Sequence, residues 1–188
     1  MPNRNSIERS ANFGYYADIL WCCVPLMVMA CFYYGPRPLL LMLTGLFTAY
    51  VCDCLAAPLH GPNYRPHEPS SEAFAALIVL MMPASVPYGV VIAAVIMAVL
   101  IKETFGGEGH YPFHPAAVGV AVAALSWPGE VFRYPAPGTV LPLWDVPDEA
   151  LSAGMNAALS GGGLPSDTTM NLFTGAVAGP LGAGAILV

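Results

Sequence analysis

The sequence predicts an all-α integral membrane protein with about six transmembrane or half-membrane helices. Of its 188 residues, 56% are hydrophobic and only 10% are charged, whereas about a quarter of the residues in a water-soluble domain carry a charge. The apolar residues form separate runs, several of which approach the ~20 residues that a helix needs to cross a bilayer. The net charge of −6 excludes a nucleic-acid-binding role, which requires a basic surface.

The first two spans are expected at residues 17–34 and 38–57, joined by a tight Gly-Pro-Arg-Pro turn at residues 35–38. Residues 1–16 are expected to form a cytoplasmic N-terminal segment that contains Arg4 and Arg9. No cleavage site typical of a removed signal peptide follows them. A polar loop with four prolines then leads to the third helix, for which Ser70 or Ser71 is the expected N-cap.

The third apolar segment, residues 72–82, stops at Pro83. It reaches only ~16 Å, about half of the hydrocarbon core, so it is either a half-helix or the start of a helix that continues past Pro83 with a kink. Further helices are expected at residues 88–102 and 115–127, which complete a five-helix membrane repeat over residues 17–127. Pro115 suits the first turn of the last of these helices.

Residues 128–170 are expected to form an outer loop rich in proline, glycine and acidic residues. Residues 171–188 are expected to begin the next membrane helix. Because this apolar run ends without an anchoring charge or aromatic residue, we expect the natural protein to continue beyond it.

The Lys and Arg residues predict the orientation of the chain, because cytoplasmic loops carry an excess of them. A cytoplasmic N-terminus places four of these residues inside and two outside: Arg4, Arg9, Arg65 and Lys102, against Arg37 and Arg133. The acidic loop 128–170 then lies on the outer face.

The most informative segment is residues 106–115, in which three glycines and two prolines interrupt two apolar runs. Irregular backbone at membrane depth is tolerated where it is buried in protein or lines a polar cavity, and such breaks often mark binding sites. The alternative is a turn that links two spans. His110 and His114 are four residues apart, but Pro112 between them disrupts the helical spacing that would direct both at one metal. We expect them to form hydrogen bonds in a polar pocket.

Two carboxylates and five cysteines lie in or near the apolar runs. Asp18 is expected at the membrane interface, whereas Asp53 is expected to pair with Arg65 or a partner subunit, or to belong to an ion pathway. We expect the cysteines to behave as small hydrophobic side chains, and a cluster shared with a partner stays open. They are Cys22, Cys23, Cys31, Cys52 and Cys54.

The segment Ser166-Asp-Thr-Thr169 follows a glycine-rich stretch and precedes the last apolar run. Taken alone, it is typical of a helix N-cap, with Ser166, Asp167 or Thr168 accepting backbone N–H bonds. A helix N-terminus next to glycines also suits a phosphate, and a threonine hydroxyl there could carry a phosphate covalently.

The run Lys102-Glu-Thr-Phe105-Gly-Gly-Glu-Gly109-His-Tyr-Pro112-Phe-His114-Pro-Ala116 resembles a family signature. The signature is K-x-x-F-G-G-x-G-x-N-P-F-N-P-A of the D subunit of the Rnf complex, a relative of the B subunit of the sodium-pumping NADH:quinone oxidoreductase. The segment from Ser71 to Pro83 is similar to the family's proline-ended half-helix. The signature contains two asparagines that this chain lacks. His110 lies next to the position of the first, and His114 occupies the position of the second.

The resemblance implies an α-helical subunit with two five-helix halves resembling urea-channel repeats, of which this chain holds the first and the start of the second. It also implies FMN attached through its phosphate to the last threonine of an S/T-G-A-T sequence. Ser166-Asp-Thr-Thr169 matches this sequence at Ser166 and Thr169, and Gly163 replaces an acidic residue that usually precedes it. The implied cofactor-binding residues are Thr169, Ser166, Thr168, Gly106, Gly107, Gly109, His110 and His114, and a second flavin is compatible with the family.

By the same resemblance, the protein is a multi-pass subunit of an ion-translocating oxidoreductase complex in the inner (cytoplasmic) membrane. Electrons would pass through FMN, coupled to Na⁺ or H⁺ movement, and the partners would be other membrane and peripheral subunits of the complex and the lipid bilayer. The alternative is a channel or transporter-like membrane protein without a redox cofactor, in which residues 106–115 line a solute path.

Overall fold

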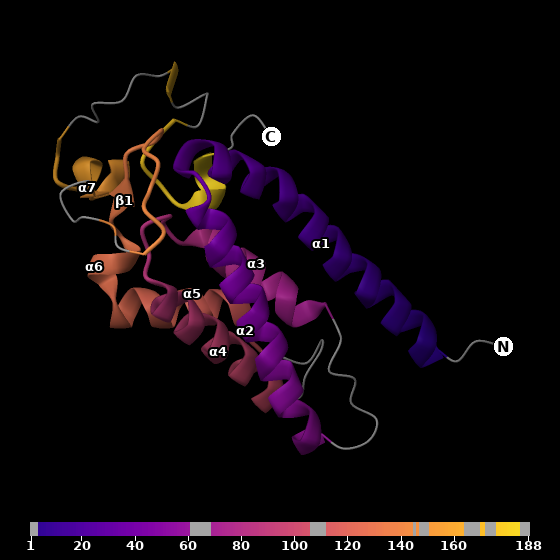
Figure 1. The fold of residues 1–188 in the computed structure, drawn as a ribbon. Coiled ribbons are helices and arrows are strands. Elements are labelled where there is room, and N and C mark those ends of the chain that lie inside the picture. Colours follow the sequence, from indigo (N-terminus) through magenta and orange to yellow (C-terminus); the bar gives the residue numbers. More distant parts are fainter. Residues whose placement is uncertain are drawn as a thin grey trace.

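The computed structural model describes residues 4–60, 69–105, 112–144, 146, 151–163, 170–171 and 176–184. Its fold is mostly helical (Figure 1). Five longer helices follow one another along the chain: α1 (Arg4–Tyr34), α2 (Arg37–His60), α3 (Ser70–Met81), α4 (Tyr88–Thr104) and α5 (Pro115–Ser126). The later part of the chain adds short elements: α6 (Pro128–Val131), β1 (Tyr134–Pro135), β2 (Leu151–Ser152), α7 (Gly154–Ser160) and the 3₁₀ helix η2 (Leu181–Gly184).

Within the described part of the chain, two helices are long and apolar enough to cross a membrane, by length and composition. They cover Gly14–Tyr34 within α1 and Arg37–Ala57 within α2, which agrees with the apolar helices predicted at residues 17–34 and 38–57. Gly35 forms the turn between them with a φ of +79°, a conformation that costs glycine little. Helix α1 begins at Arg4, inside the segment predicted to precede the membrane.

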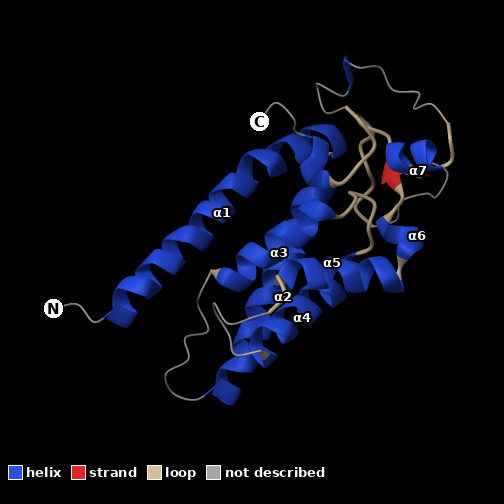
Figure 2. Cartoon of the chain, turned by 180° about the vertical axis from the view of Figure 1, so that it is seen from behind, coloured by secondary structure: helices blue, strands red, loops and turns tan. Residues whose placement is uncertain are grey.

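The helices pack into one body in which α2 contacts α3 and α4, α4 contacts α5, and α1 contacts α3 (Figure 2). Helices α4 and α5 approach each other closely at Gly119. A Cβ atom there would lie 2.6 Å from the carbonyl oxygen of Ala94 and 3.2 Å from the Cβ of Ala98. Glycine therefore allows the backbones of α4 and α5 to meet in the core.

Helix α3 is a half-helix, as one of the two sequence interpretations has it. It ends at Met81, and Met82 takes an extended conformation with φ −98° and ψ 160°. The interpretation that the helix continues past Pro83 is therefore wrong. The backbone N–H of Leu181 donates a hydrogen bond of 3.0 Å to the carbonyl of Met82, so η2 covers the end of the half-helix.

The predicted serine cap of α3 is wrong. The N-cap position is Pro69, and no side chain caps the helix within the described residues. Ser71 lies inside the first turn, where its hydroxyl binds Asp53 instead of the helix backbone. The serine therefore serves a contact between helices.

Two parts of the C-terminal region differ from the sequence prediction. The expected outer loop contains α6, α7 and a two-stranded antiparallel ribbon, in which Tyr134 pairs with Ser152. In the expected final span, the described residues 176–184 form bends followed by η2, not an α-helix. Glycines and Pro180 in this segment disfavour continuous helix, because proline removes a backbone donor and glycine adds conformational freedom.

Candidate functional site

A buried arginine joins two separate segments at the end of the molecule where α2 begins. Arg37 begins α2 and is only 1% exposed. Its guanidinium donates to backbone carbonyls of two separate segments. The bonds run from Nε to Ala84 at 2.9 Å, from Nη1 to Pro142 at 2.8 Å and to Leu143 at 3.0 Å, and from Nη2 to Ser85 at 3.3 Å and to Val86 at 3.2 Å. The planar fork of five donors on arginine suits this arrangement.

Neighbouring contacts join the same two segments, residues 84–88 and residues 133–143. Tyr88 donates its hydroxyl to the Leu143 carbonyl at 2.6 Å, and its ring centroid lies 5.3 Å from the Arg37 guanidinium. Ser85 donates to the Arg133 carbonyl at 3.0 Å. We call this set of contacts around Arg37 the outer latch, after the sequence prediction that residues 128–170 lie on the outer face. It attaches the start of the loop that follows α6 to the break between α3 and α4.

A second buried polar cluster lies toward the opposite end of α2, where α2, α3 and α4 meet. Lys102 Nζ donates to Ser71 Oγ at 2.7 Å, and Ser71 Oγ donates to Asp53 Oδ1 at 2.8 Å. The Lys102 ammonium lies 3.9 Å from Asp53 Oδ1. These side chains belong to residues that are 3%, 0% and 1% exposed, for Lys102, Ser71 and Asp53. We call them the inner triad.

Two further carboxylates lie beside the inner triad. Glu103 Oε1 is 3.5 Å from Lys102 Nζ, and both Glu103 and Glu72 are close enough to repel the Asp53 carboxylate. Oε2 of Glu72 is buried and has no hydrogen-bond partner among the described residues. Among the described side chains of this cluster, the Lys102 ammonium therefore lies near the carboxylates of Asp53 and Glu103, and Glu72 adds a third carboxylate that acts on Asp53.

The structure places a lysine beside Asp53. The charged partner described for Asp53 is Lys102, which the sequence analysis used only for the orientation of the chain and as the first residue of the family signature. Arg65, the partner named from the sequence, lies outside the described residues. Arg37 and Lys102 are both buried, although the orientation prediction treats both as loop charges.

Most predicted cofactor-binding residues lie outside the described residues. They are Gly106, Gly107, Gly109, His110, Ser166, Thr168 and Thr169. Of the predicted set, the described member is His114, at the N-cap of α5. Its side chain is exposed, with the ring edge-on to Phe74 at a centroid distance of 5.2 Å, so it does not line an enclosed polar pocket. A contact between His114 and a flavin stays a prediction.

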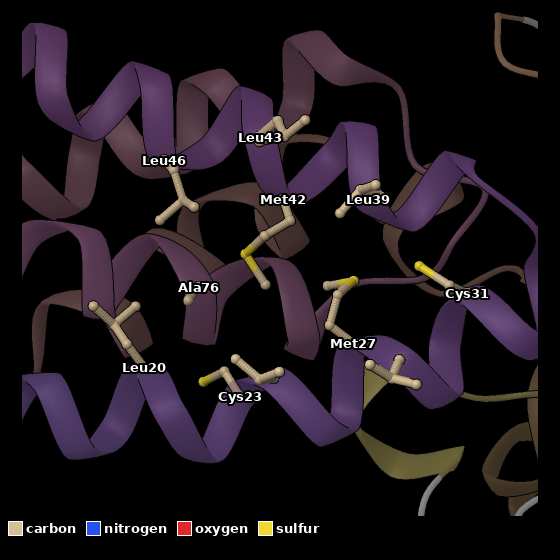
Figure 3. Close-up of a pocket in the computed structure, with 11 residues that line it drawn as sticks. Leu20, Cys23, Met27, Cys31, Leu39, Met42, Leu43, Leu46 and Ala76 are labelled. Atoms are coloured by element: carbon tan, nitrogen blue, oxygen red, sulfur yellow. The ribbon is translucent and has the colours of Figure 1, made fainter.

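An apolar groove of about 530 Å³ lies between α1 and α2, with α3 at its floor (Figure 3). Cys23, Met27 and Met42 point into it from the two spans. Its lining is aliphatic or sulfur-containing: Leu20, Cys23, Val24, Met27, Val28, Cys31, Leu39, Met42, Leu43, Leu46 and Ala76. The lining offers no charged group to bind a phosphate, so the groove does not resemble a nucleotide site.

Sequence reasoning missed the roles of Arg37, Ser71 and Lys102. Arg37 lies between two prolines in a turn that joins two apolar spans, and Lys102 lies within an apolar helix directly before the glycine-proline break. Cations next to or inside apolar runs are costly unless they are paired. This cost could have indicated that each cation has a buried partner, although it does not identify the partner.

Comparison with known protein sequences identifies relatives of this chain. The sequence profile of the NQR2, RnfD, RnfE family matches residues 9–188. The D subunit of the ion-translocating oxidoreductase complex from Pseudomonas aeruginosa is 32% identical over 130 residues, which are 68% of this chain and 38% of that protein. Proteins of the same name from Haemophilus influenzae and Shewanella denitrificans are 30% and 29% identical, over 65% and 62% of this chain and 35% and 34% of their own lengths.

The similarity to these three proteins therefore spans between 34% and 38% of their lengths. The family match is broader on this chain, because it begins at Arg9 and reaches Val188. It includes both spans, the half-helix, the outer latch and the inner triad. The chain belongs to the NQR2, RnfD, RnfE family.

Proposed function

We propose that this chain is part of a membrane subunit that carries electrons through covalently bound FMN, coupled to the movement of Na⁺ or H⁺. The observation that carries the proposal is the family match over residues 9–188, together with relatives named as ion-translocating oxidoreductase subunits. The proposal includes the cytoplasmic membrane as location, a cytoplasmic N-terminus, and other subunits of the same complex as partners. It also includes an architecture in which α1 to α5 form the first of two repeats.

In this proposal, Thr169 provides the hydroxyl that forms a phosphoester with FMN, and FMN supplies the redox chemistry. The neighbouring Ser166 and Thr168 shape the turn that presents this hydroxyl. The described structure supports the proposal through residues that precede the attachment segment in the chain. The outer latch fixes residues 142–143 against the break between α3 and α4 through Arg37. The loop that leads to the attachment segment therefore starts from a rigid base.

A transporter-like protein without a redox cofactor is the second candidate. The observation that favours it is the pair of 12-residue helices, α3 and α5. Each is too short to span the ~30 Å hydrocarbon core. Broken helices of this kind form solute and ion sites in many transporters. The two candidates differ in whether the protein carries flavin.

In-gel flavin fluorescence of the denatured protein separates the two candidates, because only a covalently bound flavin stays with the band. We expect a fluorescent band from the protein purified in its native complex. Thr169→Ala should abolish the fluorescence, because only a hydroxyl can form the phosphoester. Thr168→Ala is the matched control and should reduce fluorescence slightly at most. A non-fluorescent native band would favour the transporter-like candidate.

A further inference from the structure

We propose that the inner triad of Asp53, Ser71 and Lys102 is a proton-exchange site within the membrane domain. The proposal deepens the function given above, because it names H⁺ as the ion that this site handles. It rests on the proposed function only for the claim that the protein couples this proton exchange to electron transfer. The exchange itself follows from the geometry of three buried side chains.

The hydrogen bonds of the triad run in one direction through a hydroxyl group. Lys102 donates to Ser71 at 2.7 Å and Ser71 donates to Asp53 at 2.8 Å, whereas the direct distance from ammonium to carboxylate is 3.9 Å. The serine is therefore the link between the two ionisable groups. A hydroxyl both accepts and donates, which is what a proton relay needs.

The transfer that this chain of bonds permits is balanced. Ser71 Oγ releases its proton to Asp53 Oδ1 while it takes one from Lys102 Nζ, so that one N–H bond breaks and one carboxyl O–H bond forms. The ammonium becomes an amine and the carboxylate becomes a carboxylic acid, and the total charge of the triad is unchanged. A water molecule can then accept the proton from Asp53, and another water molecule can donate a proton to Lys102, so that one proton has passed through the triad.

Burial makes both protonation states accessible. An ion pair loses its hydration when it is buried, and the mutual attraction of the two charges only partly offsets that cost. The near-complete burial of Lys102, Ser71 and Asp53 therefore favours the neutral acid–amine pair more than exposure to water would. Intramembrane ionisable residues in such arrangements are typical of proton relays.

The surrounding charges favour the uptake of a positive charge. From α3 and α4, Glu72 and Glu103 act on Asp53, so that the described side chains of the cluster include three carboxylates and one ammonium. Helix α1 contributes Tyr16, which packs on Phe74, and an exposed Asp18. The sequence of α5 contains no charged residue. An excess of negative charge in a medium of low dielectric constant binds a proton more readily than in water.

The same geometry favours a proton over Na⁺. A sodium ion bound to Asp53 Oδ1 would lie close to the Lys102 ammonium, which is already within 3.9 Å of that oxygen. Two like charges at such a distance repel strongly in a buried site. A proton meets no such obstacle, because it is carried by the groups themselves.

Infrared spectroscopy of the reconstituted native complex tests the proposal without relying on turnover. We expect a carbonyl band of a protonated carboxyl group that titrates with pH and is unaffected by Na⁺ at constant pH. The band should be absent from the double variant Asp53→Asn/Lys102→Met, which removes both charges and so avoids an unpaired buried cation. The same preparations should retain their covalent flavin, measured independently, so failure of the flavin proposal is distinguishable from failure of this one.

The serine supplies a matched pair of variants. Ser70 and Ser71 are adjacent, and both are 0% exposed. Among the described contacts, only the Ser71 hydroxyl forms hydrogen bonds with Asp53 and Lys102. After a pH jump, Ser71→Ala should slow the change of the carboxyl band about tenfold or more, whereas Ser70→Ala should respond as the native protein does. Equal rates in the two variants, a band that persists in the double variant, or a band that shifts with Na⁺ at constant pH would each overturn the proposal.

Discussion

Arg37 and Tyr88 donate hydrogen bonds to the same backbone oxygen, the carbonyl of Leu143, at 3.0 Å and 2.6 Å. The arginine also lies over the tyrosine ring, 5.3 Å from its centroid. One carbonyl of the outer loop is therefore held by the first residue of α2 and the first residue of α4. Because residues at the starts of two core helices hold it, the loop has little freedom at this point.

The outer latch predicts a large cost for a conservative substitution. Arg37→Lys keeps the positive charge but loses the planar fork, so it cannot serve carbonyls of both segments. We expect the free energy of unfolding in detergent to fall by about 3 kcal/mol, as when a buried charge loses its partners. Denaturant unfolding followed by tryptophan fluorescence would measure this change.

Two variants control for this prediction. Arg133→Lys makes the same change at an exposed arginine and should alter stability by less than about 1 kcal/mol. Tyr88→Phe removes one hydrogen bond of the latch but keeps the ring over Arg37, and should cost about 1 kcal/mol. If Arg37→Lys is no more destabilising than Arg133→Lys, the latch does not stabilise the outer loop.

The packing of α4 on α5 gives a second prediction. Gly119→Ala places a methyl group 2.6 Å from the Ala94 carbonyl oxygen, so the two helices must move apart at a cost of about 1–3 kcal/mol. Gly89→Ala in α4 is the matched control, because a Cβ there meets nothing within 4 Å. Thermal unfolding of the two variants should show a lower Tm for Gly119→Ala and little change for Gly89→Ala. Equal Tm values would mean that the helices can separate at no cost.

The proline and glycine positions predict the helix ends of this fold well. Residues 35–36 separate the first two helices, the half-helix stops before Pro83, and α5 starts at Pro115. Local chemistry decides each of these, because proline lacks a donor and glycine tolerates the turn conformation. The final apolar run is predicted less well, because composition indicates that a segment is hydrophobic but not that its described residues, 176–184, fold as bends and η2.

The outer latch and the inner triad could not be predicted from the sequence, for a different reason. The carbonyls that bind Arg37 lie 47 to 106 residues away along the chain, and backbone acceptors leave no mark on the sequence. The inner triad takes one residue from each of three helices, so its assembly depends on the way in which α2, α3 and α4 pack. Asp53 is recognisable as unusual because an intramembrane carboxylate is costly, but the sequence does not identify its partners.

The orientation of the chain gives a third prediction. In a variant whose five native cysteines are replaced by alanine, a cysteine introduced at Ser152 should react with a membrane-impermeant reagent added from outside. Ser152 is exposed on β2. A cysteine introduced at Asn63 should react only when the cytoplasmic face is accessible. The reverse pattern would place residues 151–163 in the cytoplasm and contradict the proposed topology.

The most direct test of the proposed function is peptide mass spectrometry of the protein purified in its native complex. A peptide covering residues 161–171 contains both candidate hydroxyls next to one another, and fragmentation between Thr168 and Thr169 distinguishes them. We predict that this peptide carries the mass of FMN less one water, located on Thr169. An unmodified peptide from the intact complex would contradict electron transfer through covalent FMN in this chain.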